Sequence, residues 1–185
     1  LALKGLVLKA FIGILNSDKN KKPNFTAKNQ IIDESKFCLK KLSDKQKETT
    51  DEILSEISKK EHMVNLLDGV TGSGKTEIYF AIIAKILKEK FSDKFLGQSK
   101  QGGQILVLLP EIALTSQLLV RFEDQFGFKP ALWHSKITPK EKKEIFYGIV
   151  SGSVRVLIGA RSSLLLPFKN LQLIIIDEEH DSSFK

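Results

Sequence analysis

Cysteine is nearly absent from this sequence: Cys38 is the only one in 185 residues. A single cysteine cannot form a disulfide within the chain, and it cannot supply the cysteine ligands of a structural zinc site. Such scarcity is typical of proteins in a reducing compartment, so we expect a cytoplasmic location.

The sequence also lacks a long uninterrupted apolar run. Residues 1–15 read LALKGLVLKAFIGIL, but Lys4 and Lys9 interrupt them and the segment is too short to cross a bilayer. A secretory signal would keep its charges at the front and its apolar stretch unbroken. We therefore expect no membrane partner. Methionine is equally scarce, and because the only one is Met63, we expect the sequence to begin inside a longer protein.

Arginine is rare, and lysine supplies most of the positive charge. The formal net charge is +7 and the pI is about 9.4. This excess favours a polyanionic partner, although a lysine-rich solvated surface would give the same composition. The apolar and charged fractions, 42% and 28%, are those of a soluble globular protein.

The chain divides into three parts by composition. Residues 1–15 read as the tail of a preceding domain. Residues 16–41 begin with a polar, lysine-rich stretch broken by Pro23, which predicts a linker. Residues 42–185 carry regular apolar patterns and are expected to form one folded domain without internal repeats.

Within that domain, apolar runs without polar alternation are separated by amphipathic helical patterns. The runs predicted as buried strands are Met63–Leu67, Ile105–Leu109, Ala131–Trp133, Val154–Ile158 and Leu171–Ile176. Capping boxes at Ser43–Gln46 and Thr138–Glu141 predict two helix starts. The alternation indicates an α/β fold, with a mostly parallel sheet and helices on both faces. Ligands of such sheets bind beyond the carboxyl ends of the strands.

The segment Gly69-Val70-Thr71-Gly72-Ser73-Gly74-Lys75-Thr76 fits the phosphate-binding pattern G-x-x-x-x-G-K-[ST]. Its glycines let backbone N–H groups point at a phosphate, and the following helix start adds partial positive charge. Lys75 would reach the β- and γ-phosphates of ATP, and the Thr76 hydroxyl would bind Mg²⁺. A chance glycine-rich turn is the alternative, but the predicted strand before it and helix after it argue against that.

A second motif, Asp177-Glu178-Glu179-His180, follows the most apolar predicted strand. Asp177 would hold Mg²⁺, and Glu178 would orient or deprotonate the attacking water. In isolation the motif would indicate a solvated acidic turn. Together with the phosphate loop, it favours a site for Mg²⁺ and ATP.

Several motifs together resemble one family. GVTGSGKTEIY, LPEIALT, the Trp133-His134-Ser135 turn, IGARSSLLLPFKNL and IIIDEEHDSSFK are similar, in the same order, to the replication-restart helicases of the PriA (primosomal protein N′) family in superfamily two. The resemblance covers Leu42 to Lys185. It implies the first RecA-like P-loop NTPase lobe of an ATP-dependent 3′-to-5′ DNA helicase, which acts at replication forks in primosome assembly.

The resemblance also assigns roles to individual residues. His180 would couple hydrolysis to DNA, and the residues expected to contact the DNA backbone are Pro110, Glu111, Thr115, Arg161, Ser162 and Ser163. Short hydroxyl donors and a guanidinium suit phosphates rather than base edges. The alternatives are a surface ion pair for Arg161 and helix capping for the two serines.

Two further residues, Gln46 and His134, have two interpretations each. Gln46 lies where related helicases place a glutamine that reads adenine, but it also completes a capping box with Ser43. His134, with Ser135 beside it, is either a DNA contact or a histidine satisfied at a strand end.

The resemblance implies more than this chain contains. The family's zinc-binding cysteines, second lobe and arginine finger would lie beyond Lys185, so we expect the isolated chain to bind ATP weakly and to be inactive as a helicase. Winged-helix character is expected before the linker, at residues 1–15. Expected partners are single-stranded and forked DNA, primosome proteins and single-strand-binding proteins. Other readings are a different superfamily-two DNA translocase, an RNA-directed helicase, or a non-catalytic nucleic-acid-binding remnant of a split gene.

Overall fold

The computed structural model describes residues 28–59, 63–70, 72–88, 102–110, 116–178 and 181. Its elements are η1 (Glu34–Lys36), α2 (Asp44–Ser58), α3 (Lys75–Lys88), β1 (Gln104–Leu108), α4 (Ser116–Phe126), β2 (Ala131–Trp133), α5 (Pro139–Ser151), β3 (Val156–Gly159), η3 (Arg161–Leu165) and β4 (Leu171–Ile176). Strands and helices alternate along most of this order.

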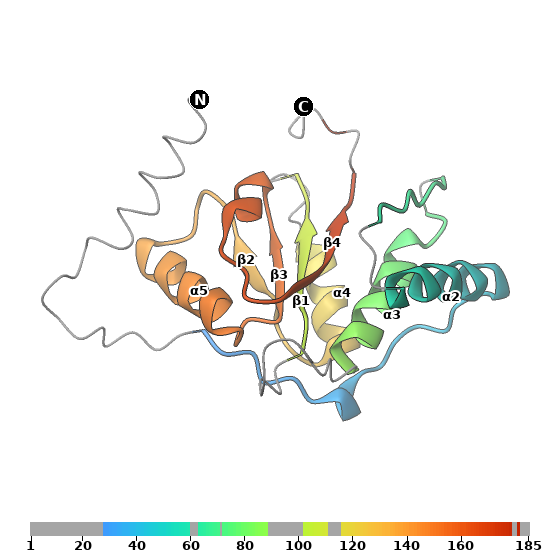
Figure 1. Cartoon of the computed structure of the whole chain (residues 1–185), viewed down its shortest axis with the longest axis horizontal. Helices are drawn as coiled ribbons and strands as arrows, with labels where there is room; N and C mark the ends of the chain where they lie inside the picture. The colour runs from blue at the N-terminus through green and yellow to red at the C-terminus, as the bar shows by residue number, and fades with distance from the viewer. Residues whose placement is uncertain are drawn as a thin grey trace, which may run out of the picture.

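The described strands form one parallel sheet with the order β2-β3-β1-β4. Helices α3 and α4 pack against one face of this sheet, and α5 packs against the other (Figure 1). Helix α2 lies outside α3 and adds its apolar side chains to the same core. The predicted α/β fold with a parallel sheet between helices is confirmed.

Two helices begin where their capping signals predict. At α2, the Ser43 hydroxyl accepts from the Gln46 amide while the Gln46 side chain accepts from the Ser43 amide. At α5, Thr138 and Glu141 make the same reciprocal pair, with Pro139 in the first turn. Helix α5 ends at Gly152, whose φ of 80° is left-handed and therefore suits glycine.

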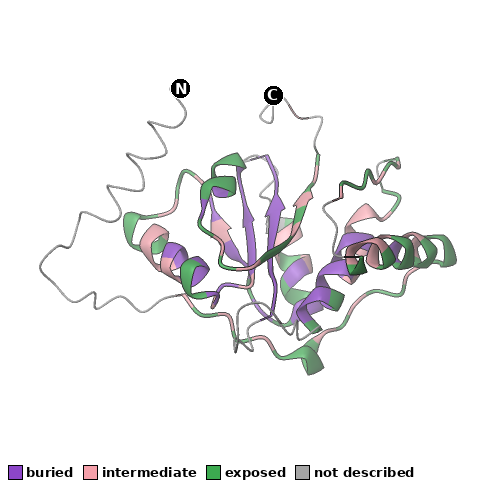
Figure 2. Cartoon of the chain, in the orientation of Figure 1, coloured by how far each residue is buried: buried purple, intermediate pink, exposed green. Residues whose placement is uncertain are grey.

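The core has two layers because successive side chains of each strand point to opposite faces. Ile105 and Val107 of β1 face α3 and α4, where Phe80, Phe122 and Phe126 pack edge-to-face or stacked. The residues between them face α5; the members of that second layer include Leu106, Leu108, Leu157, Ile145 and Ile149. Strands β1 and β3 are thus buried on both faces, as Figure 2 shows.

The prediction of a buried strand over Met63–Leu67 is wrong. These residues form no regular element, and the side chains of Val64 and Leu66 are 88% and 83% exposed. An apolar run becomes a strand only where a neighbouring strand and a covering layer receive it. Among the described residues the sheet ends at β4, which has no strand on its outer side.

Strand β4 has the predicted bounds, but only one of its faces is covered. Leu173 and Ile175 pack on the layer of α3 and α4, whereas Ile174 and Ile176 are 44% and 51% exposed. Helices therefore cover both faces of β1 and β3, whereas the described helices cover only one face of β4. Helix α5 lies over the opposite end of the sheet (Figure 1).

The described part of the segment predicted as a linker packs on the domain. The Gln30 side chain accepts from the amides of Arg155 and Val156 and donates to the Val156 carbonyl. Farther along, the Cys38 amide donates to Gln125, and Phe37 packs edge-to-face on Phe126. Residues 28–41 are therefore attached to the lobe by hydrogen bonds and ring contacts. Residues 1–27, with the expected tail of a preceding domain, lie outside the described residues.

In the part of the chain that the structure describes, no helix has both the length and the apolar character needed to span a bilayer.

Candidate functional site

The candidate residues follow the carboxyl ends of the strands, in the order of the sheet. His134 and Ser135 follow β2, and Arg161 and Ser162 follow β3. Pro110 follows β1, and Asp177 follows β4. Because all four strands are parallel, these positions lie along one edge of the sheet. The basic and hydroxyl-bearing loops occupy one end of that edge, and the acidic motif occupies the other.

The phosphate loop leads directly into α3. The Ser73 amide donates to the Val70 carbonyl at 3.1 Å, which closes a turn, and the Gly74 carbonyl accepts from the amides of Glu77 and Ile78. Gly74 has a φ of 86°, a left-handed conformation that a residue with a side chain would adopt only with strain, so glycine suits this position. This turn leads directly into the first turn of α3, whose backbone amides and partial positive charge attract anions.

The lysine and threonine of the loop lie in the first turn of α3. Lys75 Nζ donates to the Gly69 carbonyl, so its ammonium group lies across the loop. The backbone amides of Lys75 and Thr76 have no acceptor within the helix, as is general for a first turn. Both side chains are partly exposed. An ammonium group, helix amides and a hydroxyl therefore converge here.

The acidic motif continues the pairing of β4 with β1. The Asp177 amide donates to the Leu108 carbonyl, and Asp177 Oδ1 accepts from the Glu178 amide at 3.0 Å. Glu178 has a φ of 54°, the one left-handed conformation among the described non-glycine residues. A glutamate held there is unusual, and such conformations gather at functional sites. The Glu178 side chain is exposed.

Tyr79 joins the loop to the acidic motif. Its hydroxyl lies 3.1 Å from Asp177 Oδ2, and Tyr79 lies one helical turn after Thr76 on α3. Burial, and then the negative charge of Asp177, raise the pKa of Tyr79, so its hydroxyl keeps its proton at neutral pH. The structure therefore joins the start of α3, which carries Thr76, to Asp177, about a hundred residues later in the sequence.

Glu77 attaches the same turn of α3 to its neighbours. Its Oε1 lies 2.5 Å from the Arg121 guanidinium on α4 and 3.4 Å from Lys40 Nζ. Burial raises the pKa of Glu77, but the hydrogen bond and positive charge of Arg121 outweigh it, so the net pKa is lowered. The carboxylate is thus charged at neutral pH and holds the helix start against α4.

Gln46 touches the phosphate loop while it caps α2. Its Oε1 accepts from the Ser43 amide at 2.9 Å, and its Nε2 donates to the Ser73 carbonyl at 2.9 Å. The capping box is therefore present. Both ends of the amide are already engaged, so reading an adenine edge would require one of these bonds to be shared or exchanged.

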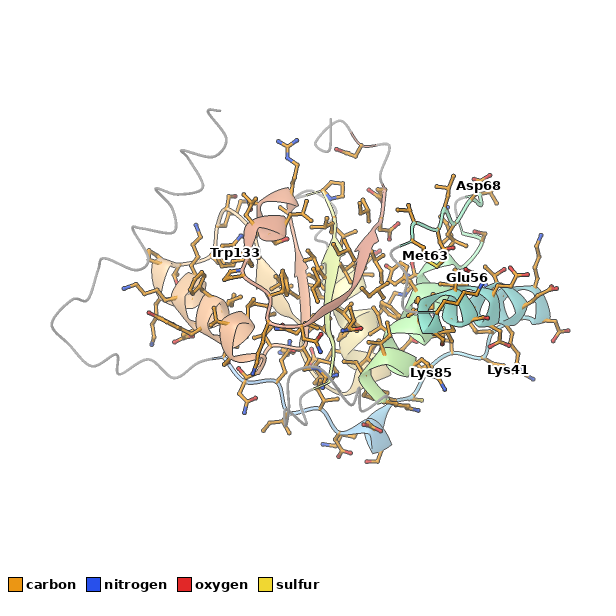
Figure 3. All side chains as sticks on the ribbon, in the orientation of Figure 1. Lys41, Glu56, Met63, Asp68, Lys85 and Trp133 are labelled. Atoms are coloured by element: carbon orange, nitrogen blue, oxygen red, sulfur yellow. The ribbon has the colours of Figure 1, made fainter. Side chains whose placement is uncertain are left out.

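The two loops expected to contact DNA lie side by side. The Ala160 amide donates to the Trp133 carbonyl, which brings the η3 turn against the turn after β2. Trp133 is labelled in Figure 3, on the side of the molecule away from α2 and α3. Arg161, Ser162 and Ser135 are exposed there.

Other members of the predicted DNA-binding set are less accessible. Ser163 is fully buried and its hydroxyl donates to the Ala160 carbonyl, so it stabilises the turn and cannot meet a phosphate in this conformation. Pro110 is also buried. His134 is partly exposed, and its Nδ1 accepts from the Lys136 amide at 3.3 Å.

Four predicted site residues lie outside the described residues, so their positions relative to the site stay predictions. They are Thr71, Glu111, Thr115 and His180.

The donor set around Tyr79 fits a magnesium–triphosphate. Mg²⁺ sites of this kind use one or two carboxylates together with substrate phosphates and waters, rather than a closed protein cage. Accordingly, no cluster of three or more His, Cys, Asp or Glu side chains that could hold a metal occurs within the described ranges. Asp177 and the Thr76 hydroxyl are oxygen ligands of the type that Mg²⁺ prefers, and Lys75 adds the charge that phosphates need.

Comparison with known proteins agrees with this geometry. The profile of the DEAD/DEAH box helicase family matches residues 43–185, which include the phosphate loop and the acidic motif. The chain belongs to the DEAD/DEAH box helicase family. Helicases of this family use ATP and Mg²⁺ in general.

Individual relatives are much longer than this helicase domain. The chain is 48% identical over 172 residues to the replication restart protein PriA of Rickettsia felis, and 43% identical over 144 residues to that of Bacillus subtilis. It is 52% identical over 149 residues to the protein of the same name in Rickettsia prowazekii. These alignments cover 93%, 78% and 80% of the chain, but only 24%, 16% and 20% of the respective relatives.

Sequence reasoning missed Tyr79, Glu77 and Arg121. A weak signal existed for Tyr79, because it lies three residues after Thr76 and so shares its helix face. No local signal pairs Tyr79 with Asp177, since that contact depends on the sheet order.

Proposed function

We propose that this chain is the ATP-binding lobe of a DNA-dependent ATPase that drives unwinding in replication restart. The observation that carries the proposal is the hydrogen bond from the Tyr79 hydroxyl, one helical turn after Thr76 of the phosphate loop, to Asp177 of the acidic motif. Two motifs with separate sequence signatures thereby meet at one place. The similarity to replication restart proteins named PriA supports the biological role.

In this proposal each residue of the loop has a separate task. Lys75 and the first amides of α3 hold the β- and γ-phosphates, and Thr76 and Asp177 hold Mg²⁺. The bound ion would offset the negative charge of the phosphates. Glu178 orients or deprotonates the water that attacks the γ-phosphate, and His180 links that step to DNA.

The nucleic-acid surface would be the exposed turns after β2 and β3. Arg161, Ser162 and Ser135 can all contact phosphate oxygens, and His134 lies next to them. Single-stranded DNA running along this edge would pass beside the nucleotide site without sharing its ligands. The net charge of +7 supports a polyanionic partner.

The decisive experiment measures nucleotide binding by titrating the chain with a fluorescent ATP analogue, with and without Mg²⁺. Binding should be weak, should require Mg²⁺, and should fall about 10- to 100-fold in Lys75→Ala, which removes a charge-assisted contact. Lys85→Ala is the matched control, because Lys85 is an exposed lysine farther along the same helix (Figure 3).

Single-stranded DNA binding by the same variants separates the two surfaces. Lys75→Ala should retain it, whereas Arg161→Ala should weaken it. Absence of Mg²⁺-dependent nucleotide binding in the unchanged chain would refute the proposal and favour a non-catalytic nucleic-acid-binding remnant. Stronger binding to single-stranded RNA than to DNA would point to an RNA helicase instead.

The wider activity belongs to the longer protein that the relatives represent. There we propose ATP hydrolysis, 3′-to-5′ unwinding of forked DNA, and interaction with primosome and single-strand-binding proteins. A zinc site would lie in that remaining part. A strand-displacement assay on forks with either single-stranded arm labelled would decide the direction.

A further inference from the structure

Tyr79 contacts the nucleotide site without belonging to either of its motifs. It lies on the buried face of α3, where its ring is 5% exposed and packs edge-to-face on Phe80 at 5.2 Å between ring centroids. Ring packing alone would be met by phenylalanine. The hydroxyl is the part that needs explanation, because a buried hydroxyl destabilises a fold unless it has hydrogen-bond partners.

The direction of its hydrogen bond follows from chemistry. A carboxylate oxygen accepts, so the Tyr79 hydroxyl donates to Asp177 Oδ2 at 3.1 Å. Hydrogen bonds to a carboxylate are stronger than those between neutral groups.

Two hydrogen bonds restrict the orientation of the acid. Asp177 Oδ1 accepts from the Glu178 amide, and Oδ2 accepts from Tyr79, so each carboxylate oxygen has a fixed partner. Each oxygen keeps a further lone pair for another ligand. The carboxylate is thus held in place while it remains able to bind a cation.

We propose that Tyr79 is a positioning residue that fixes the orientation of the Asp177 carboxylate beside the start of α3 before Mg²⁺ and nucleotide bind. The inference rests on the proposed function, since it needs Asp177 to be a magnesium ligand. It adds a residue that neither the phosphate-loop pattern nor the acidic motif contains. Hydrogen-bond partners of metal ligands commonly have this role, and losing one weakens metal affinity about 10- to 100-fold.

The test is Tyr79→Phe, which removes the hydroxyl and keeps the ring. The measured quantity is the Mg²⁺ concentration that gives half-maximal binding of a fluorescent ATP analogue to the chain. We expect it to rise about tenfold, while nucleotide binding at saturating Mg²⁺ stays unchanged. Tyr147→Phe is the matched control, because Tyr147 is the only other tyrosine and lies on α5, across the sheet.

A double variant shows whether Tyr79 acts through Asp177. In an Asp177→Asn background, Tyr79→Phe should have no further effect on the Mg²⁺ dependence, because the positioned group is already gone. Equal effects in both backgrounds would show that Tyr79 acts only through the packing of α3, and would overturn the inference.

A second measurement does not require the variant to fold. With two tyrosines in the chain, ring-labelled tyrosine gives two sets of NMR signals, and Tyr147→Phe assigns them. In the unsubstituted chain, adding Mg²⁺ and nucleotide should shift the Tyr79 signals and leave the Tyr147 signals in place. If the chain binds Mg²⁺ and nucleotide but the Tyr79 signal and the Tyr79→Phe midpoint are both unchanged, the inference fails alone. If the chain binds no nucleotide, the proposed function fails with it.

Discussion

Strand β1 and strand β4 are neighbours in one sheet, yet their surroundings differ. All residues of β1 are buried, because α3 and α4 cover one face and α5 the other. Strand β4 pairs with β1 at every residue except Gln172, where the register shifts, but its side chains are exposed or only partly buried. In Figure 2, β1 is therefore coloured as buried and β4 as partly buried or exposed. Pairing therefore fixes the position of a strand, and the helices around it decide how much its side chains contribute.

The proposed nucleotide site lies on the less covered side of the sheet. Asp177 extends β4, and the phosphate loop follows residues 63–67, of which Val64, Asn65 and Leu66 are exposed. The hydrogen bond of Tyr79 and the ion pair of Glu77 then join this side to the well-packed helices α3 and α4. The position of the proposed site residues thus depends on a few polar contacts rather than on a continuous core.

The largest expected effect compares two residues that are paired across the sheet. Leu106 of β1 and Ile174 of β4 are register partners, but Leu106 is fully buried and Ile174 is 44% exposed. Leu106→Ala should lower the free energy of unfolding by about 2–5 kcal/mol, because it leaves a cavity in the α5 layer. Ile174→Ala should cost less than about 1 kcal/mol.

Urea unfolding of both variants, followed by circular dichroism, checks this difference. Similar m-values would show that both variants unfold from the same compact state. A cost for Ile174→Ala that matches that of Leu106→Ala would mean that something covers the outer face of β4 in solution.

The sequence predicts local features best where one residue or a short spacing decides the outcome. The capping boxes at Ser43 and Thr138 and the stop at Gly152 are confirmed because each is local chemistry. Strand β4 is predicted with its bounds, since Leu171–Ile176 has no competing pattern. Burial is a different quantity, because it depends on which distant element covers a face.

The same limit explains the errors and omissions. Residues 63–67 have the composition of a buried strand, but composition cannot say whether a neighbouring strand will accept them. Tyr79 was overlooked because its partner Asp177 is 98 positions away, and only the sheet order brings them together. Ser163 has a side chain suited to phosphate, yet the η3 turn buries it.

A smaller effect is expected at the ion pair that ties α3 to α4. Glu77→Gln should lower the free energy of unfolding by about 1 kcal/mol at neutral pH, since the Arg121 partner is partly exposed. Glu56→Gln is the matched control: Glu56 pairs with Lys59 on the surface of α2 (Figure 3), and its loss should be close to neutral.

The lowered pKa of Glu77 also predicts how the stability difference caused by Glu77→Gln changes with pH. The pKa of folded Glu77 lies below its ordinary value of 4.5, because the Arg121 hydrogen bond outweighs the effect of burial. A lowered pKa contributes stability above the ordinary value, and this contribution is lost as the pH falls through the folded pKa. The stability difference between the unchanged chain and Glu77→Gln should therefore shrink as the pH falls below 4.5. A difference that grows on acidification would show that the pair does not form.

The smallest expected effect lies at Val64, which is 88% exposed in the segment before the phosphate loop. Val64→Ser should change the free energy of unfolding by less than about 0.5 kcal/mol, because exposed side chains away from special features contribute little. Val107→Ser, at a fully buried position of β1, should cost several kcal/mol in the same urea titration. A loss of about 2 kcal/mol at Val64 would instead mean that residues 63–67 add to the free edge of β4 as a fifth strand in solution. A fifth strand would cover the exposed edge of β4 and make its surroundings similar to those of β1. Val64→Ser, which has the smallest expected effect, is therefore also the most direct test of the difference between these two strands.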